Sequence, residues 1–176
     1  MTQKIALFRG VNVGGHNRLP MKELARILEA NGCKNVRTYI QSGNVVYEGT
    51  ASDAAIGAAI ETNFGFHPQM FILTACALKK IAADCPYQKQ AKKDPKSVHL
   101  SFLESAPPKN AAEEFDKIKT SAEEFSIIGK VLYLHSPKGL SASKIAEKAD
   151  RIFKVKTTSR NWNTIEALLD LCNKAA

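Results

Sequence analysis

The stretch VRTYIQSGNVVYE, residues 36–48, decides the fold because it places two strand-forming runs on either side of a Ser-Gly pair. β-Branched and aromatic residues favour strands, and a glycine in a short polar connection favours a hairpin turn. The pattern therefore predicts two antiparallel strands, Val36–Gln41 and Asn44–Glu48, joined through Ser42 and Gly43.

A helix and a strand are predicted on each side of this hairpin. Upstream, the apolar run Lys4–Arg9 predicts a strand, and a helix begins at Pro20, a residue favoured in the first helical turn. Downstream, a helix capped by Ser52 or Asp53 runs to about residue 63, and a strand follows at Met70–Thr74. The first half of the chain is thus expected to have the order β-α-β-β-α-β.

The second half repeats this order with little residue identity. A capping-box pattern that begins at Asn163 predicts an additional terminal helix. Two consecutive β-α-β-β-α-β units predict an α+β protein with two ferredoxin-like halves related by duplication. The expected divisions are a half at residues 1–74, a basic helical connector at 75–96 and a half at 97–176. The predicted strands and helices of the second half are Ser97–Leu103, Asn110–Lys119, Glu124–Ile128, Val131–His135, Ser141–Phe153 and Lys156–Arg160.

The composition is that of a soluble globular protein, with 44% hydrophobic and 24% charged residues in a chain of 176. The N-terminal apolar run leads straight into Arg9, so no secretory signal is predicted, and no apolar stretch approaches the roughly 20 residues of a membrane span. The four cysteines lack zinc-finger spacing, which predicts reduced thiols and no structural metal. We therefore expect a cytoplasmic protein without a membrane segment or a cofactor. The sequence selects no oligomeric state.

Positive charge is concentrated in the second half of the chain. The net charge is +8; residues 1–74 hold seven Lys or Arg and five Asp or Glu, whereas residues 75–176 hold eighteen and twelve. Six lysines lie between residues 79 and 96. Such a tract attracts polyanions, including nucleic acid, or forms a solvated, mobile linker that lysine keeps soluble.

The most unusual segment is FRGVNVGGHNR, residues 8–18, between the first strand and the first helix. Glycine permits left-handed backbone conformations and close backbone approach, and the helix N-terminus that follows favours anions. The segment is neither a Walker A loop nor G-x-G-x-x-G, so it gives no support for ATP or NAD binding by those routes. A tight turn in which Asn12 and Asn17 form Asx turns explains the same residues without a ligand.

Four motifs together resemble the signature of a bacterial family of uncharacterised proteins, domain of unknown function 1697. They are LFRGVNVGG at residues 7–15, LPM at 19–21, YIQSGNVV at 39–46 and RNWNT at 160–164. The resemblance spans the chain and implies a cytosolic α+β protein with two ferredoxin-like halves. It implies no activity, cofactor or catalytic residue.

The motif residues are mostly polar or glycine and fall at strand ends and turns, where folds often carry binding chemistry. Guanidinium groups and backbone N–H groups would hold an anion, and side-chain amides would orient it. We therefore predict that a small polar or anionic molecule binds at a shared site. The candidate residues are Arg9, Asn12, Gly14, Gly15, Gln41, Ser42, Asn44, Arg160, Asn161 and Asn163.

An RNA-binding module is the alternative function. If Ile5 and Leu7 face the helices, alternation turns Phe8 to the open face of the sheet, together with Tyr39 and Tyr47. RNA-recognition domains of the same topology stack bases on such aromatics. The basic connector would add attraction for the RNA backbone.

No catalytic constellation decides whether the protein is an enzyme. Residues 141–144 match the S-x-x-K pattern of penicillin-binding enzymes, but Ser141 is well placed as an ordinary helix cap. The four histidines share no metal-ligand spacing.

Overall fold

The computed structural model describes residues 2–174, which separate into two compact units. One unit contains the residues up to Lys80 together with those from Glu166 onward, and the other contains Ile81–Ile165. The expected divisions at residues 74, 96 and 97 differ from this grouping, because the connector is shared between the units and the end of the terminal helix belongs with the first.

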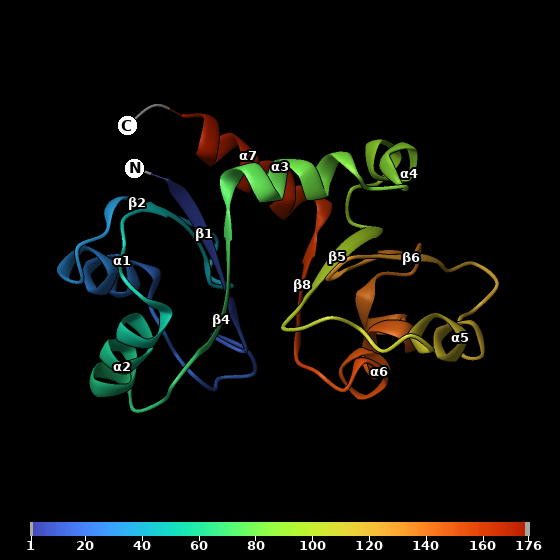
Figure 1. The fold of residues 1–176 in the computed structure, drawn as a ribbon, viewed down its shortest axis with the longest axis horizontal. Helices are drawn as coiled ribbons and strands as arrows, with labels where there is room; N and C mark the ends of the chain where they lie inside the picture. Colours follow the sequence, from blue (N-terminus) through green and yellow to red (C-terminus); the bar gives the residue numbers. More distant parts are fainter. Residues whose placement is uncertain (1, 175–176) are drawn as a thin grey trace. The chain divides into compact units, whose positions relative to one another are not determined.

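The first unit is a four-stranded antiparallel sheet with two helices on one face (Figure 1). Its strand order is β2-β3-β1-β4, and the chain passes through the elements in the predicted order β-α-β-β-α-β. The elements are β1 (Gln3–Arg9), α1 (Met21–Ala30), β2 (Lys34–Tyr39), β3 (Asn44–Glu48), α2 (Asp53–Phe64) and β4 (Gln69–Thr74), followed by α3 (Ala75–Ala83).

The second unit repeats the topology, with the strand order β6-β7-β5-β8. The two sheets therefore have equivalent connections, as a duplicated ferredoxin-like fold requires. Its elements are α4 (Gln88–Lys93), β5 (Val98–Leu103), α5 (Ala111–Asp116), β6 (Glu124–Ile128), β7 (Val131–His135), a short 3₁₀ turn η1 (Leu140–Ala142), α6 (Lys144–Phe153) and β8 (Thr157–Asn161). The terminal helix α7 (Trp162–Asn173) begins in this unit, and its residues from Glu166 onward belong to the first.

The core of the first unit corrects the predicted orientation of β1. Ala6 and Phe8 pack on the helix side with Tyr47 of β3, so Ile5 and Leu7 point to the opposite face, where they are also buried. The RNA-binding alternative requires Phe8 and Tyr47 on the open face of the sheet. Both residues lie on the helix side instead. The prediction was wrong because both alternating sets of β1 are apolar, and a period of two then cannot say which set faces the helices.

The core of the second unit is built around an aromatic cluster beneath α5 and α6. The Phe115 ring lies edge-on to Phe125 and Phe153, with ring centroids 5.5 and 5.0 Å apart. Such edge-to-face pairs add to the free energy gained from burial alone. Val98, Leu100 and Phe102 of β5 are paired with β7 residues that lie outside this helix-side cluster.

Helix caps agree with the sequence at one helix and differ at two others. Ser52 caps α2, as predicted, by accepting a hydrogen bond from the Ala55 N–H at 3.1 Å. Ser143, rather than Ser141, caps α6, because residues 140–142 form the 3₁₀ turn η1 and the helix begins only after them. Asn161, rather than Asn163, accepts hydrogen bonds from the backbone and hydroxyl of Thr164, so α7 begins two residues earlier than the capping-box pattern indicated.

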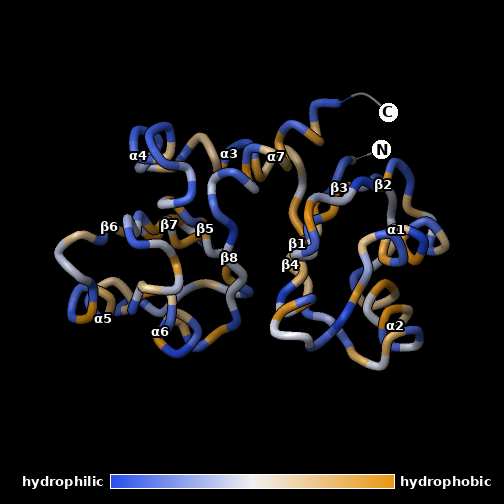
Figure 2. Tube along the Cα trace, turned by 180° about the vertical axis from the view of Figure 1, so that it is seen from behind, coloured by the Kyte–Doolittle hydropathy of each residue, from blue (hydrophilic) through white to orange (hydrophobic). Residues whose placement is uncertain are grey.

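The segment 75–96 contains two helices rather than a mobile linker. Leu78 and Ala82 of α3 and Ala91 of α4 are buried, whereas all six lysines of the segment are exposed. Figure 2 shows both hydrophobic and hydrophilic residues along the chain trace of these helices. Among residues 2–174, the structure contains no helix long and apolar enough to cross a membrane.

Candidate functional site

The glycine-rich segment after β1 folds back on itself as a miniature hairpin. Gly14 and Gly15 both have positive φ, at 58° and 79°, and the His16 N–H donates to the Val13 carbonyl at 3.0 Å. Positive φ at both central residues of a four-residue turn is the type I′ pattern, which glycine satisfies without steric cost. The tight-turn interpretation of these two glycines is therefore confirmed, and the turn carries the segment away from β1 and back.

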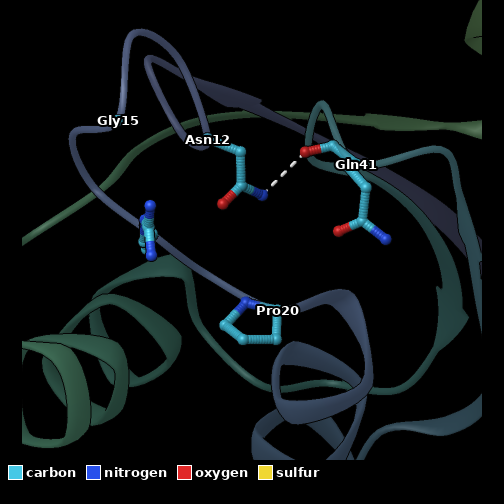
Figure 3. A pocket seen from close by; sticks show the side chains of 5 residues that line it. Asn12, Gly15, Pro20 and Gln41 are labelled. Carbon is cyan, nitrogen blue, oxygen red and sulfur yellow. Dashed lines mark hydrogen bonds between the residues drawn. The ribbon is translucent and has the colours of Figure 1, made fainter.

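Asn12 holds this hairpin to the rest of the first unit. Its amide nitrogen donates to the carbonyl oxygens of Leu19 at 2.9 Å and Gln41 at 2.7 Å, and its amide oxygen accepts from the Leu19 N–H at 2.8 Å (Figure 3). One side chain thus ties the start of the loop, the approach to α1 and the β2–β3 turn together. Because both amide protons are used, Asn12 acts mainly by fixing the shape of the site.

The β2–β3 turn packs closely against β1. The Phe8 N–H donates to the Gly43 carbonyl at 2.8 Å, and a Cβ atom on Gly43 would lie 2.6 Å from both the Phe8 Cβ and a methyl group of Val11. Asn44 is fully buried, and its amide nitrogen donates to the Tyr39 carbonyl at 3.2 Å and the Ser42 hydroxyl at 2.9 Å. These contacts place Gln41 opposite the glycine hairpin.

An open pocket of about 420 Å³ lies between these two segments, lined by Asn12, Gly15, Arg18, Pro20 and Gln41. In Figure 3 the labelled lining residues come from the glycine hairpin, the start of α1 and the β2–β3 turn. Within residues 2–174, neither the Arg18 guanidinium group nor the Gln41 side-chain amide has a hydrogen-bond or ion-pair partner. The pocket thus offers one cation and one carboxamide to a ligand.

Helix α1 begins at the edge of this pocket. Pro20 occupies its N-cap position, with extended backbone angles and no side-chain capping bond. The first N–H groups of a helix have no partner inside the helix and form the positive end of its dipole. The helix start therefore adds positive potential on the side of the pocket that Arg18 also lines.

The structure brings three of the predicted site residues, Asn12, Gly15 and Gln41, to this pocket. Arg18 also lines the pocket, although the predicted set did not include it. Its signal in the sequence was its position just before the helix, two residues before the N-cap residue Pro20. Gly14 lies in the hairpin turn, and Arg9 is half-buried at the end of β1, opposite Gln69.

Two further predicted residues of the first unit support the β2–β3 turn. Ser42 is exposed and accepts a hydrogen bond from Asn44, which is itself buried inside the turn. Neither residue is among those that line the pocket. Their observed contacts position the neighbouring Gln41.

The remaining predicted residues, Arg160, Asn161 and Asn163, belong to the second unit. Arg160 is buried, and one guanidinium nitrogen donates to the Thr158 hydroxyl at 2.9 Å and the Ser159 carbonyl at 2.8 Å. Burial lowers the pKa of Arg160 to about 10, because the charged guanidinium group loses solvation. Asn161 is the cap of α7, and Asn163 is half-buried in the first turn of that helix.

The chemistry offered by the first-unit pocket is recognition of polar or charged groups. No carboxylate or histidine lines it, so the lining set holds no general acid or base of those types. Among residues 2–174, no group of three or more His, Cys, Asp or Glu side chains is placed to hold a metal ion.

Comparison with known proteins places the chain in a family and supports its fold. The structure of the conserved bacterial protein SP0830 from Streptococcus pneumoniae is similar over 99% of each chain, with a TM-score of 0.75 and 20% sequence identity. At that identity the likeness shows the fold alone. No curated protein matches the chain. The model of the family described as "Protein of unknown function (DUF1697)" matches residues 1–133, and the chain therefore belongs to this family.

Proposed function

We propose that the first unit binds a small polar or anionic molecule in the pocket between the glycine hairpin and the β2–β3 turn. The observation that carries the proposal is Arg18, whose guanidinium group lines the pocket and has no protein partner within residues 2–174. Guanidinium presents paired N–H donors that match a carboxylate or phosphate group.

The other lining groups support the same ligand chemistry. The Gln41 carboxamide offers both donors and an acceptor, and the start of α1 adds positive potential. A volume of about 420 Å³ lies within the range of small-molecule sites in proteins. The ligand is therefore expected to carry an anionic group together with further polar groups.

Preorganisation of the pocket supports affinity. The three hydrogen bonds of Asn12 hold the hairpin and the β2–β3 turn at a fixed separation before any ligand arrives. A rigid site loses less conformational entropy on binding than a mobile loop does.

A thermal-shift and calorimetric screen against carboxylates, sugar phosphates and nucleotides tests the proposal. A ligand at about 100 times its dissociation constant stabilises the folded protein by roughly 2.7 kcal/mol. Arg18→Gln should abolish the shift that the best ligand causes. Lys34→Gln is the matched control, because it also removes one exposed positive charge from the first unit but lies outside the pocket.

The comparison of these two variants decides the outcome. If the ligand-induced thermal shift were reduced equally in Arg18→Gln and Lys34→Gln, general charge attraction rather than the pocket would hold the ligand. No shift with any member of the panel would reject the proposed function. Arg9→Ala belongs in the same series, because the sequence predicts that Arg9 contacts the ligand although Arg9 is not among the residues that line the pocket.

A further inference from the structure

A second cavity lies in the other unit, where α4 leads into β5. Its volume is about 400 Å³, and its lining residues are Gln90, Lys93, Asp94, Ser97, His135 and Pro137. They come from α4, from the segment that connects α4 with β5, and from the end of β7 with the residues that follow it. The proposed function uses none of them.

The walls of this cavity are fixed by side-chain contacts. The Gln90 amide donates to a carboxylate oxygen of Glu124 in β6 at 3.1 Å, which ties α4 to the sheet. The Ser97 hydroxyl donates to the Asp94 carbonyl at 2.7 Å, and the Lys96 N–H donates to the Asp94 carboxylate at 3.1 Å. The lysines of this segment are therefore displayed on an ordered scaffold.

Lys93 lines the cavity, and three further lysines lie close to it in the sequence. Lys89, Lys92, Lys93 and Lys96 are all exposed, and none has an ion-pair partner within residues 2–174. Asp94 is the one acidic residue between positions 89 and 96. Unpaired cations of this density favour a ligand with negative charge.

His135 supplies an unsatisfied polar atom at the same place. Its side chain is 17% exposed, and its Nδ1 atom is buried with no hydrogen-bond partner among the described residues. The Glu124 carboxylate is the nearby acceptor, but at 3.6 Å it lies beyond hydrogen-bond distance. A buried ring nitrogen without a partner is an exception that calls for an explanation.

We propose that this cavity binds a phosphorylated, hydroxyl-bearing small molecule of the sugar phosphate or nucleotide class. Lys93 and His135 hold the phosphate, and the Asp94 carboxylate accepts hydrogen bonds from hydroxyl groups. In this arrangement the His135 Nε2–H group donates to the phosphate. The Nδ1 atom of the same ring lies 3.6 Å from the Glu124 carboxylate.

The carboxylates at the cavity disfavour a ligand that carries negative charge throughout. Asp94 lines it, and Glu124 lies behind His135. A ligand that is anionic throughout would face both, whereas a sugar phosphate directs its charge to Lys93 and its hydroxyls to Asp94.

NMR titration of the full chain tests the proposal with four probes: ribose 5-phosphate, adenosine 5′-monophosphate, inorganic phosphate and ribose. We expect the two phosphorylated sugars to shift the amide signals of residues 90–97 and the ring signals of His135. Their affinity should exceed that of inorganic phosphate and of ribose by about tenfold or more, since both ends of the ligand are recognised. Equal affinity for ribose 5-phosphate and inorganic phosphate would overturn the proposal.

Two adjacent lysines provide the matched control. Lys93 lines the cavity and Lys92 does not, although both are exposed and carry the same charge. Lys93→Gln should weaken ribose 5-phosphate binding about tenfold or more, and Lys92→Gln less than threefold. Equal effects would indicate non-specific attraction and overturn the site. His135→Gln should weaken binding as well, and retained affinity in a folded His135→Gln variant would contradict the assigned role.

Discussion

At the scale of single residues, Gly43 occupies a position where backbone conformation and packing both exclude a side chain. Its φ is 71°, and an added Cβ atom would lie 2.6 Å from atoms of Phe8 and Val11. The left-handed conformation and the overpacking each cost a non-glycine residue about 1–2 kcal/mol. Gly43→Ala should therefore lower the free energy of unfolding by about 3 kcal/mol, measured by urea denaturation.

Gly65 is the control for that substitution. It has φ of 76° at the end of α2, but a Cβ atom added there would have no neighbouring atom within 4 Å. Gly65→Ala should cost only the conformational part, about 1 kcal/mol. Equal losses at the two positions would show that packing against β1 contributes nothing.

Tyr47 and Tyr133 are equivalent in burial and opposite in hydrogen bonding. Among residues 2–174 the Tyr47 hydroxyl is buried without a partner, whereas the Tyr133 hydroxyl donates to the Ile81 carbonyl at 2.8 Å. Tyr47→Phe should leave stability unchanged or raise it by about 1 kcal/mol, and Tyr133→Phe should lower it by about 1 kcal/mol. Urea unfolding at neutral pH measures both. A large loss in Tyr47→Phe would show that this hydroxyl has a partner in solution.

Burial of Tyr47 also predicts sensitivity to alkaline pH. Loss of solvation raises its pKa from 10.0 to about 12. Between these pH values the folded state retains a proton that the unfolded state has lost, so stability decreases as the pH rises. The free energy of unfolding, measured from pH 9 to 12 (a range set around the usual tyrosine pKa of about 10), should fall less steeply in Tyr47→Phe than in the parent. Identical slopes would contradict the assignment.

At the scale of elements, two serines near the start of α6, Ser141 and Ser143, have different roles. The Ser143 hydroxyl accepts a hydrogen bond from the Ala146 N–H at 3.2 Å, while Ser141 lies exposed in η1. Loss of a helix cap costs about 1 kcal/mol. Ser143→Ala should therefore lower the melting temperature by several degrees, and Ser141→Ala should leave it nearly unchanged. A reversed order would restore Ser141 as the cap that the sequence predicted.

Local sequence patterns predict the bounds of some strands and helices correctly and those of others incorrectly. The strands β3, β6 and β7 have the predicted bounds, because each is a short run of strand formers bounded by turn residues. Helix α5 is shorter than predicted, Ala111–Asp116 instead of Asn110–Lys119. After Asp116 the chain forms a turn, in which the N–H groups of Ile118 and Lys119 both donate to the Phe115 carbonyl and Ile118 packs against the core, so the regular helix ends earlier than its polar residues suggest.

At the scale of the whole molecule, Arg37 of the first unit binds the end of the terminal helix. One guanidinium nitrogen of Arg37 in β2 donates to the carbonyl oxygens of Leu171 at 2.9 Å and Lys174 at 2.8 Å. A cation at a helix C-terminus satisfies the last carbonyl groups and complements the helix dipole.

Removing this contact should loosen the end of α7. Arg37→Gln is expected to lower the free energy of unfolding by about 1–2 kcal/mol, and to speed amide hydrogen exchange in the last turns of α7. Lys34→Gln, in the same strand, is the control because its side chain is exposed. Unchanged exchange in Arg37→Gln would show that α7 is held by its apolar residues alone.

The candidate site shows where sequence reasoning stops. Asn12, Gly15 and Gln41 were predicted because glycine and amide residues near strand ends suggest binding, and they do share one pocket. The predicted site included Arg9 and not Arg18. The two arginines lie at opposite ends of the same loop, so the sequence does not show which of them reaches the pocket. Only the path of the hairpin places Arg18 at the pocket.

The order of the elements, the duplicated topology and the main turns can all be read from the amino-acid sequence. They follow from local periodicity and from glycine and cap residues, each of which acts over a few positions. Which face of β1 meets the helices, which polar residues serve as scaffold and which groups line each cavity are settled only in the folded chain. Those outcomes depend on contacts between distant segments, such as Asn12 with Gln41 and His135 with Glu124, and local patterns do not encode them.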